Sequence, residues 1–84
     1  MRIIFKKKFK KSLAKQTSII QKQFTKKSLL LITNSNHSSL RIHFLKGKLS
    51  GLQSFDVTSD IRVQFYIREN EYVFVNIGTH SELY

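Results

Sequence analysis

The run Ile61-Arg62-Val63-Gln64-Phe65-Tyr66-Ile67-Arg68 decides the fold class, because its apolar and polar residues alternate without a break. Successive side chains of a β-strand point to opposite faces of the sheet, so this run predicts a strand with one covered face and one polar face. The same alternation occurs in residues 40–44, 54–58 and 73–77. Short polar connections at 46–51, 58–60 and 68–71 join these segments and predict an antiparallel meander.

The first half of the chain has helical spacing instead. Residues 2–5 predict a short strand, and Phe9 and Leu13 then stand four apart in a lysine-rich segment. After a cap at Thr17 or Ser18, a second apolar stripe recurs at helical intervals, formed by Ile20, Phe24 and Leu31 and widened by Leu30 and Ile32. Residues 33–39, rich in Ser and Asn, end it.

These elements predict an α+β fold in a single domain of residues 1–84. Two N-terminal helices are expected to pack on one face of an antiparallel sheet, in the order β-α-α-β-β-β-β, because no other segment is available to cover the apolar face. A domain of this size buries only about 60% of the surface that its unfolded chain exposes.

The composition points to a polyanionic partner. Fifteen Lys and Arg against five Asp and Glu give a net charge of +10, spread over the chain rather than confined to a tail. There is no cysteine for a disulfide or a thiolate metal site. The start of the chain is too basic for a secretory signal and no segment is long and apolar enough to span a membrane, so we expect a cytoplasmic protein that does not bind membranes.

The polar face of the sheet is the candidate site. By strand parity alone it carries Arg41, His43, Asp56, Arg62, Tyr66 and Asn76, with Lys46 and Lys48 on the connection that follows the first strand of the meander. RNA, DNA, an anionic membrane or an acidic protein would each suit the charge, and if the partner is RNA we expect these side chains to contact it. Lysine clusters also occur on ordinary solvated helices, so charge alone does not define a site.

The histidines need separate treatment, because a lone histidine is more often structural than catalytic. His43 lies on the polar face, where an imidazole suits proton transfer near neutral pH, and a role as bystander is equally open. His80 and the terminal Tyr84 suit proton transfer and base stacking, or simply anchor the chain end. The histidines lack the spacing of metal ligands, so neither a metal nor another cofactor is expected. Cleavage of RNA needs none, because the substrate's own 2′-hydroxyl is the nucleophile.

Three segments of the second half carry a resemblance to a known family. They are residues 43–49 (HFLKGKL), 51–63 (GLQSFDVTSDIRV) and 77–84 (IGTHSELY), and the closing Gly-Thr-His followed by a terminal aromatic is the most discriminating. In these segments the chain resembles the YafQ branch of the RelE/ParE toxin superfamily. The resemblance extends over nearly the whole chain, although the lysine-rich start is less specific.

The resemblance implies a toxin of a type II toxin–antitoxin system that cleaves messenger RNA on the ribosome without a metal. It implies a cognate antitoxin as partner, and binding of operator DNA by the toxin–antitoxin complex. Carried over by position, His43 and Asp60 are the catalytic histidine and aspartate of the family, His80 is the C-terminal histidine and Tyr84 is the aromatic that holds the scissile nucleotide.

Three positions depart from the family pattern. Asp56 stands where a second histidine can occur, Ile61 where a tryptophan can occur, and Asn76 where the transition-state arginine is expected. A guanidinium on a phosphate oxygen is worth a few kcal/mol, so its loss matters. Arg62 is the expected substitute, with Lys46 and Lys48 as further charges.

Two other classes of function remain open at this point. A noncatalytic toxin of the ParE kind would act on a protein such as DNA gyrase, or the chain would bind nucleic acid without cleaving it. In the third reading the chain is a structural domain of a larger assembly, and its charge reflects contact with ribosomal RNA.

Overall fold

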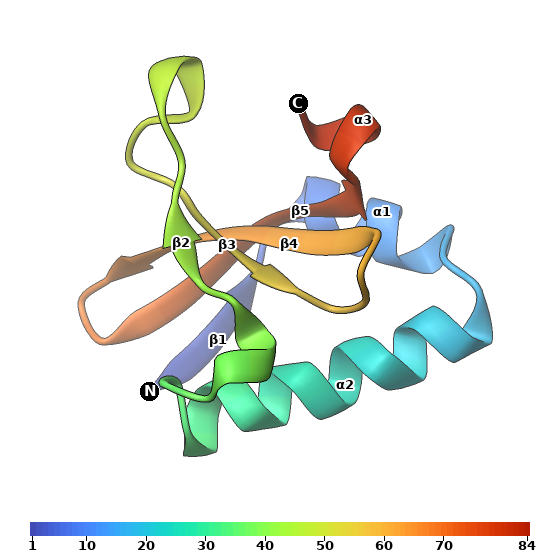
Figure 1. The fold of residues 1–84 in the computed structure, drawn as a ribbon, viewed down its shortest axis with the longest axis horizontal. Coiled ribbons are helices and arrows are strands. Elements are labelled where there is room, and N and C mark those ends of the chain that lie inside the picture. The colour runs from blue at the N-terminus through green and yellow to red at the C-terminus, as the bar shows by residue number, and fades with distance from the viewer.

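The computed structural model describes residues 1–84 and contains one five-stranded sheet, with the longest helix below it and the short C-terminal helix above it (Figure 1). The strands are β1 (Arg2–Phe5), β2 (His43–Phe44), β3 (Gln53–Asp56), β4 (Ile61–Arg68) and β5 (Glu71–Thr79). The helices are α1 (Lys7–Ala14), α2 (Ser18–Thr33) and α3 (His80–Leu83), with single 3-10 turns η1 (Ser38–Leu40) and η2 (Gly47–Leu49). None of the helices is long and apolar enough to cross a membrane.

The sheet order is β1-β5-β4-β3-β2. The meander from β2 to β5 is antiparallel, as the sequence predicts. The expectation of a wholly antiparallel sheet is wrong in one pairing, because β1 runs parallel to β5 along the edge of the sheet. The two helices carry the chain away from β1 before the meander begins, so the direction of β1 is not set by a hairpin. The α+β class stands, with a mixed sheet.

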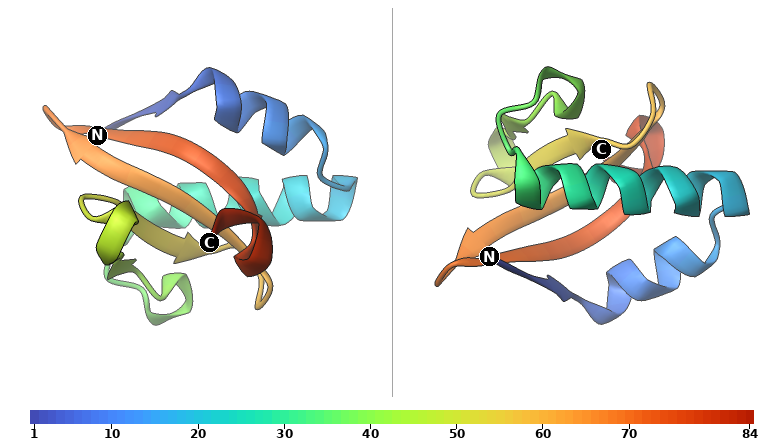
Figure 2. Two further views of the ribbon diagram at one scale, coloured as in Figure 1. Left: turned by 90° about the horizontal axis from the view of Figure 1, so that it is seen from above. Right: turned by 90° about the horizontal axis from the view of Figure 1, so that it is seen from below.

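Helix α2 lies under the sheet, and α1 runs beside it close to β5 (Figure 2). Thr17 caps α2, as expected, through a hydrogen bond from the backbone amide of Ile20 to its hydroxyl, 3.2 Å. Phe24 and Leu31 are buried against the sheet, whereas Ile32 is exposed. The helical spacing therefore predicted the stripe correctly but made it one residue too wide.

Phe74 of β5 is the centre of the core. Its ring packs within 6.3 Å, centroid to centroid, of five other phenylalanine rings, those of Phe5, Phe9, Phe24, Phe55 and Phe65. Burial of one such side chain stabilises the fold by about 1.5–3 kcal/mol. The aromatic residues thus supply the large contact areas that a chain this short requires.

A β-bulge in β5 corrects the sequence-based assignment of faces. Phe65 pairs with Phe74, and Gln64 pairs with Asn76, so Val75 is an extra residue on β5. Strict alternation had placed Val73, Val75 and Ile77 toward the helices. Instead Phe74 and Ile77 both reach the core, because the bulge reverses the parity between them.

The first strand of the meander also differs from expectation. Only His43 and Phe44 form β2, and Leu40 belongs to η1 although it is fully buried. Phe44 was expected on the covered face, yet it is 71% exposed. The reason is that β2 forms the far edge of the sheet, where no helix covers it.

Candidate active site

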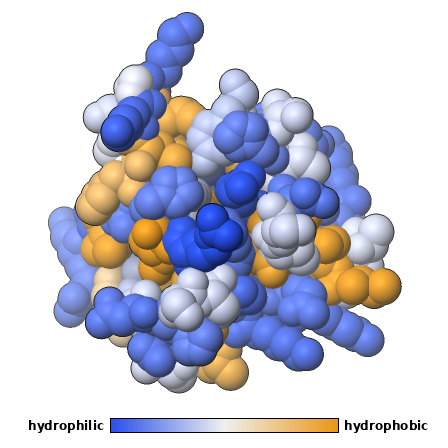
Figure 3. Space-filling model, in the orientation of Figure 1, coloured by the Kyte–Doolittle hydropathy of each residue, from blue (hydrophilic) through white to orange (hydrophobic).

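The face of the sheet opposite α2 lies between two raised segments of the chain. In Figure 1 the connection between β2 and β3, which contains η2, rises on one side of this upper face, and α3 rises on the other. Seen from the same direction, the middle of the molecule is strongly hydrophilic, with apolar patches around it (Figure 3). The side of the molecule that faces the viewer in these two figures therefore exposes a polar surface.

Asp56 joins two arginines on this face. One carboxylate oxygen lies 3.4 Å from Nε of Arg62, and the other lies 3.6 Å from Nε of Arg41. Asp56 is buried, whereas the Arg41 side chain is 77% exposed. The carboxylate thus fixes the inner end of each guanidinium through a long contact and leaves the terminal amino groups free for a ligand.

His43 is oriented by the turn that precedes it. Arg41 adopts a left-handed backbone conformation, with φ of 49°, where the chain leaves η1. Its carbonyl oxygen lies 3.0 Å from Nδ1 of His43, and the hydroxyl of Ser54 lies 3.3 Å from Nε2. Because a carbonyl only accepts, Nδ1 donates to it, and Nε2 faces the hydroxyl of Ser54.

A row of polar residues crosses the upper face beside this pair. The strand register aligns His43, Ser54, Gln64 and Asn76. Gln64 is buried, and its amide nitrogen has no hydrogen-bond partner. The alternation of β3 and β4 places Ser54 and Gln64 on this face, but an uncharged polar side chain gives no distinct sequence signal for a site, so neither residue was predicted.

The side-chain oxygen of Asn76, at the end of this row, is already occupied by hydrogen bonds within the protein. Its carboxamide oxygen accepts hydrogen bonds from the hydroxyl of Ser12 in α1, at 2.8 Å, and from the backbone amide of Ile77, at 2.9 Å. Strand β1 ends opposite Phe74, so the edge of β5 beyond that point has no strand partner. The Asn76 carboxamide accepts a hydrogen bond from a backbone amide of this edge and also joins the edge to α1. Asn76 therefore has a structural role.

The C-terminal turn holds His80 and Tyr84 together. Helix α3 begins with a reciprocal capping box, in which the Thr79 hydroxyl accepts from the Glu82 amide and the Glu82 carboxylate accepts from the Thr79 amide. These hydrogen bonds lower the pKa of Glu82 below its ordinary value of 4.5, with a smaller contribution from Lys15. The sequence T-x-x-E at 79–82 is a signal for this helix, which the strand pattern does not predict.

Gly78 makes room for that turn. A β-carbon at this position would lie 3.0 Å from Oε1 of Glu82, closer than nearly all real contacts of that kind. The carboxylate therefore folds over a residue that has no side chain. This close approach is a physical reason for glycine in the Gly-Thr-His segment.

Three residues expected in the site line one depression. Asp60, Arg62 and His80 surround an open hollow of about 470 Å³ with Ser59, Thr79 and Ser81, and no apolar residue lines it. The ring of Tyr84 lies against that of His80, with centroids 4.5 Å apart. The structure thus brings a carboxylate, a guanidinium and an imidazole to the same hollow.

The remaining expected residues lie around this hollow rather than in it. His43 is on β2, two strand spacings or about 10 Å from β4. Tyr66 is half-buried on the same face as Arg62, opposite Val73. Lys46 and Lys48 are exposed at η2. No three His, Asp or Glu side chains are grouped as metal ligands.

The model of the family described as bacterial toxin of type II toxin–antitoxin system, YafQ, matches residues 1–84. YafQ from E. coli is a solved structure with 20% sequence identity and a TM-score of 0.79, covering 100% of this chain and 99% of its own. The E. coli DinJ–YafQ complex gives the same identity, TM-score and coverage.

A chain of the YoeB–YefM complex from Staphylococcus aureus has 14% identity and a TM-score of 0.77, covering 95% of this chain and 97% of its own. No curated protein sequence matches the chain. At these identities the solved structures show a shared fold, whereas the family model matches every residue. The chain therefore belongs to the YafQ family of toxins of bacterial type II toxin–antitoxin systems.

Proposed function

We propose that this toxin is a metal-independent endoribonuclease that cleaves messenger RNA on the ribosome in the cytoplasm. The observation that carries the proposal is the hollow shared by Asp60, Arg62 and His80, with the Tyr84 ring against His80. It combines the three functions that RNA cleavage requires, namely a proton acceptor, a proton donor and a fixed positive charge.

The reaction is an attack of the substrate's 2′-hydroxyl oxygen on the adjacent phosphorus. Asp60 takes the hydroxyl proton, and Arg62 stabilises the charge on the phosphorane. His80 gives a proton to the 5′-oxygen as its bond to phosphorus breaks. The products are a 2′,3′-cyclic phosphate and a 5′-hydroxyl end.

The choice of base between Asp60 and His43 follows from their positions. Asp60 lines the hollow with Arg62 and His80, whereas His43 lies two strands from β4 and its Nε2 already contacts Ser54. We therefore assign the base to Asp60 and propose that His43, with Arg41, Lys46 and Lys48, orients the RNA. Tyr84 stacks on a base next to the cleaved bond.

The cognate antitoxin is proposed to be a small acidic protein that covers the upper face. DinJ–YafQ of E. coli is a solved toxin–antitoxin complex, and a chain of the YoeB–YefM complex shares the fold of this protein. A net charge of +10 favours an acidic partner, and the toxin–antitoxin complex would bind operator DNA.

Expression in cells tests the proposal. Induction of the toxin alone arrests growth and produces new transcript 5′ ends, and coexpression of the neighbouring small open reading frame prevents both. Normal growth with abundant soluble toxin would contradict any toxic function.

A noncatalytic toxin that binds a protein such as DNA gyrase is the second candidate. Two observations favour it: Asn76 stands in place of an arginine and is bound to Ser12, and Asp56 partly neutralises Arg62. Growth arrest without new transcript ends would identify this candidate.

A further inference from the structure

One buried polar group on the upper face has no partner. The side chain of Gln64 is 4% exposed, and its amide nitrogen makes no hydrogen bond. No other buried side-chain nitrogen or oxygen atom of the protein is left in this way. Because folding is disfavoured when a carboxamide is buried without a partner, this position indicates an acceptor that the side chain reaches by a small rotation.

Ser54 is the residue that lies within reach of this carboxamide. Gln64 and Ser54 are directly opposite each other in the antiparallel pair of β4 and β3, where the β-carbons of such a pair are about 4.5–5.5 Å apart. Ser54 is fully buried, and its hydroxyl lies 3.3 Å from Nε2 of His43. A hydroxyl has one donor and two acceptor lone pairs, so the contact with the imidazole leaves at least one lone pair for the Gln64 amide.

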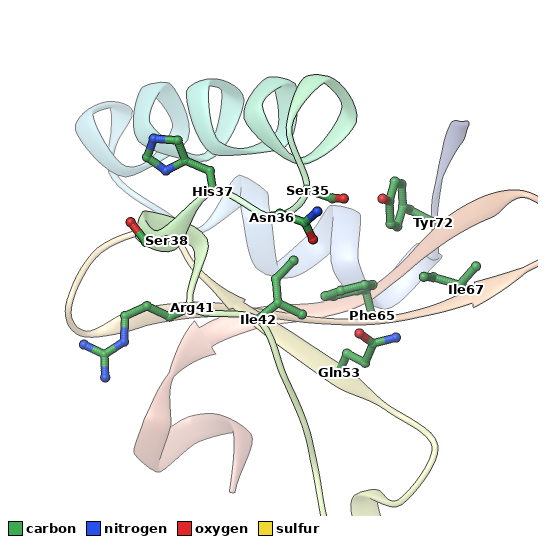
Figure 4. Close-up of a pocket in the computed structure, with 10 residues that line it drawn as sticks. All are labelled: Ser35, Asn36, His37, Ser38, Arg41, Ile42, Gln53, Phe65, Ile67 and Tyr72. Atoms are coloured by element: carbon green, nitrogen blue, oxygen red, sulfur yellow. The ribbon is translucent and has the colours of Figure 1, made fainter.

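The neighbouring residues of β3 and β4 point to the other side of the sheet. Gln53 and Phe65 line an open cavity beside Tyr72 on the helix side (Figure 4). By strand alternation, Ser54 and Gln64 therefore both point to the upper face. An exposed imidazole, a buried hydroxyl and a buried carboxamide thus form a line across β2, β3 and β4.

We infer that Ser54 and Gln64 are positioning residues for His43. The Gln64 amide donates to the Ser54 hydroxyl oxygen, and the Ser54 hydroxyl donates to Nε2 of His43. On the other side of the ring, Nδ1 donates to the carbonyl oxygen of Arg41. This chain of hydrogen bonds holds the neutral ring in one orientation and one tautomer, with its proton on Nδ1. The inference rests on the proposed function, in which His43 orients RNA.

An imidazole held in this way meets RNA with the face of its ring. Both nitrogens of His43 are occupied within the protein, so neither is available to take the proton of the 2′-hydroxyl, in agreement with Asp60 as the base. A flat ring that is already fixed loses little conformational freedom on binding and suits stacking against a base. Ser54 and Gln64 therefore act on RNA only through His43.

NMR spectra of the free protein, labelled with ¹⁵N in its histidines, test the inference without RNA cleavage. At about pH 9, where imidazole rings are neutral, wild-type His43 carries its proton on Nδ1, and the spectrum of His43→Gln identifies its signals by their loss. Ser54→Ala and Gln64→Met each increase the share of the Nε2–H form, which an unconstrained histidine prefers.

The same two variants also bind RNA more weakly. The probe is a single-stranded oligonucleotide with 2′-O-methyl sugars, which has no 2′-hydroxyl nucleophile and is not cleaved. Ser54→Ala and Gln64→Met each weaken its binding roughly two- to tenfold, the usual effect of one lost hydrogen bond.

Ser28→Ala is the matched control, because it removes a buried hydroxyl from α2 that donates to the carbonyl of Phe24. It leaves the His43 signals and the RNA affinity unchanged. Melting temperature gives an independent measurement at Gln64, since methionine has nearly the same length and no donor. Gln64→Met lowers the melting temperature, because the amide is hydrogen-bonded to Ser54. A variant that melts at or above the wild-type temperature with wild-type His43 signals would show that the amide is unpaired and would overturn the inference.

Failure of the inference and failure of the proposed function give different results. Wild-type His43 signals in both Ser54→Ala and Gln64→Met overturn the inference, whatever the activity of the toxin. Altered signals with unchanged RNA affinity overturn the role of the fixed ring in RNA binding. A wild-type protein that neither binds nor cleaves RNA refutes the proposed function, and the spectra of the free protein still decide whether Ser54 and Gln64 fix the ring.

Discussion

The ring of His80 lies against the ring of Tyr84, with centroids 4.5 Å apart and planes inclined by 38°. One short helix, fixed by the Thr79–Glu82 capping box, brings the two residues together. Tyr84 therefore limits the orientations of the imidazole at the edge of the hollow. It also remains 46% exposed, so part of its ring is free to contact RNA.

Substitution of Tyr84 separates stacking from hydrogen bonding. Tyr84→Ala slows cleavage by the loss of about 1–3 kcal/mol of base stacking, whereas Tyr84→Phe retains most of the activity because the ring remains. Rates of cleavage on purified ribosomes, with melting temperatures as the control for folding, check this. If the phenylalanine variant were as slow as the alanine variant, the hydroxyl rather than the ring would be required.

Asp60→Asn and His43→Gln identify the base. Asp60→Asn lowers the cleavage rate about 10²- to 10⁴-fold, the usual effect of losing a positioned base, with little change in RNA affinity. His43→Gln mainly weakens affinity, because this residue only orients the RNA. Single-turnover rates and RNA binding measured on both variants separate the two effects. The opposite order of rates would assign the base to His43.

Alanine substitutions of Arg62 and Lys10 show whether cleavage depends on the position of a positive charge or only on the total charge. Each substitution to alanine removes one positive charge, but Arg62 lines the hollow and Lys10 lies on the exposed side of α1. Arg62→Ala reduces cleavage by more than about 100-fold, since a guanidinium at the phosphorane is worth a few kcal/mol, whereas Lys10→Ala reduces it only slightly. Equal losses would show that the hollow is not the site of cleavage.

Glu82 makes the C-terminal turn sensitive to acid. Its pKa is lowered by the hydrogen bonds with Thr79, so its ionised form stabilises α3 at pH above 4.5 and this stabilisation is lost as the pH falls through the lowered pKa. The amide resonance of Thr79 in NMR spectra therefore shifts with pH below 4.5. Glu82→Gln keeps an acceptor but cannot titrate, and its spectrum stays constant there. A Thr79 shift that persists in the Gln variant would rule out this carboxylate as the cause.

Alternation of residues predicted much of the fold, because a strand that is covered on one side must alternate. The alternation pattern failed at Val75, where one inserted residue puts Phe74 on the covered face together with Ile77. A bulge leaves no mark in the apolar pattern, since Val73, Phe74 and Val75 are all apolar. The pattern also does not show where the helices stop covering the sheet. It therefore did not predict that Phe44, on the uncovered edge strand β2, is exposed.

The charged residues of the site were easier to predict than their partners. Arg41, Asp56 and Arg62 fall on one face by parity alone, and the structure adds that Asp56 lies between the two arginines. Asn76 turns toward Ser12 because β1 ends early, which depends on a pairing between the two ends of the chain. The cavity beside Tyr72 likewise combines residues from the loop after α2 with three strands, and no local pattern announces it.

Cleavage of messenger RNA by the purified toxin on purified ribosomes, with a metal chelator present and the chemistry of the new ends determined, tests the central claim most directly. The account predicts that the wild-type protein produces 2′,3′-cyclic phosphate and 5′-hydroxyl ends. It also predicts that His80→Ala, an exposed position, is about 10²- to 10⁴-fold slower with an unchanged melting temperature and unchanged antitoxin binding. A folded His80→Ala protein with full activity would contradict the assignment of the general acid, and no cleavage by the wild-type toxin would contradict the nuclease itself.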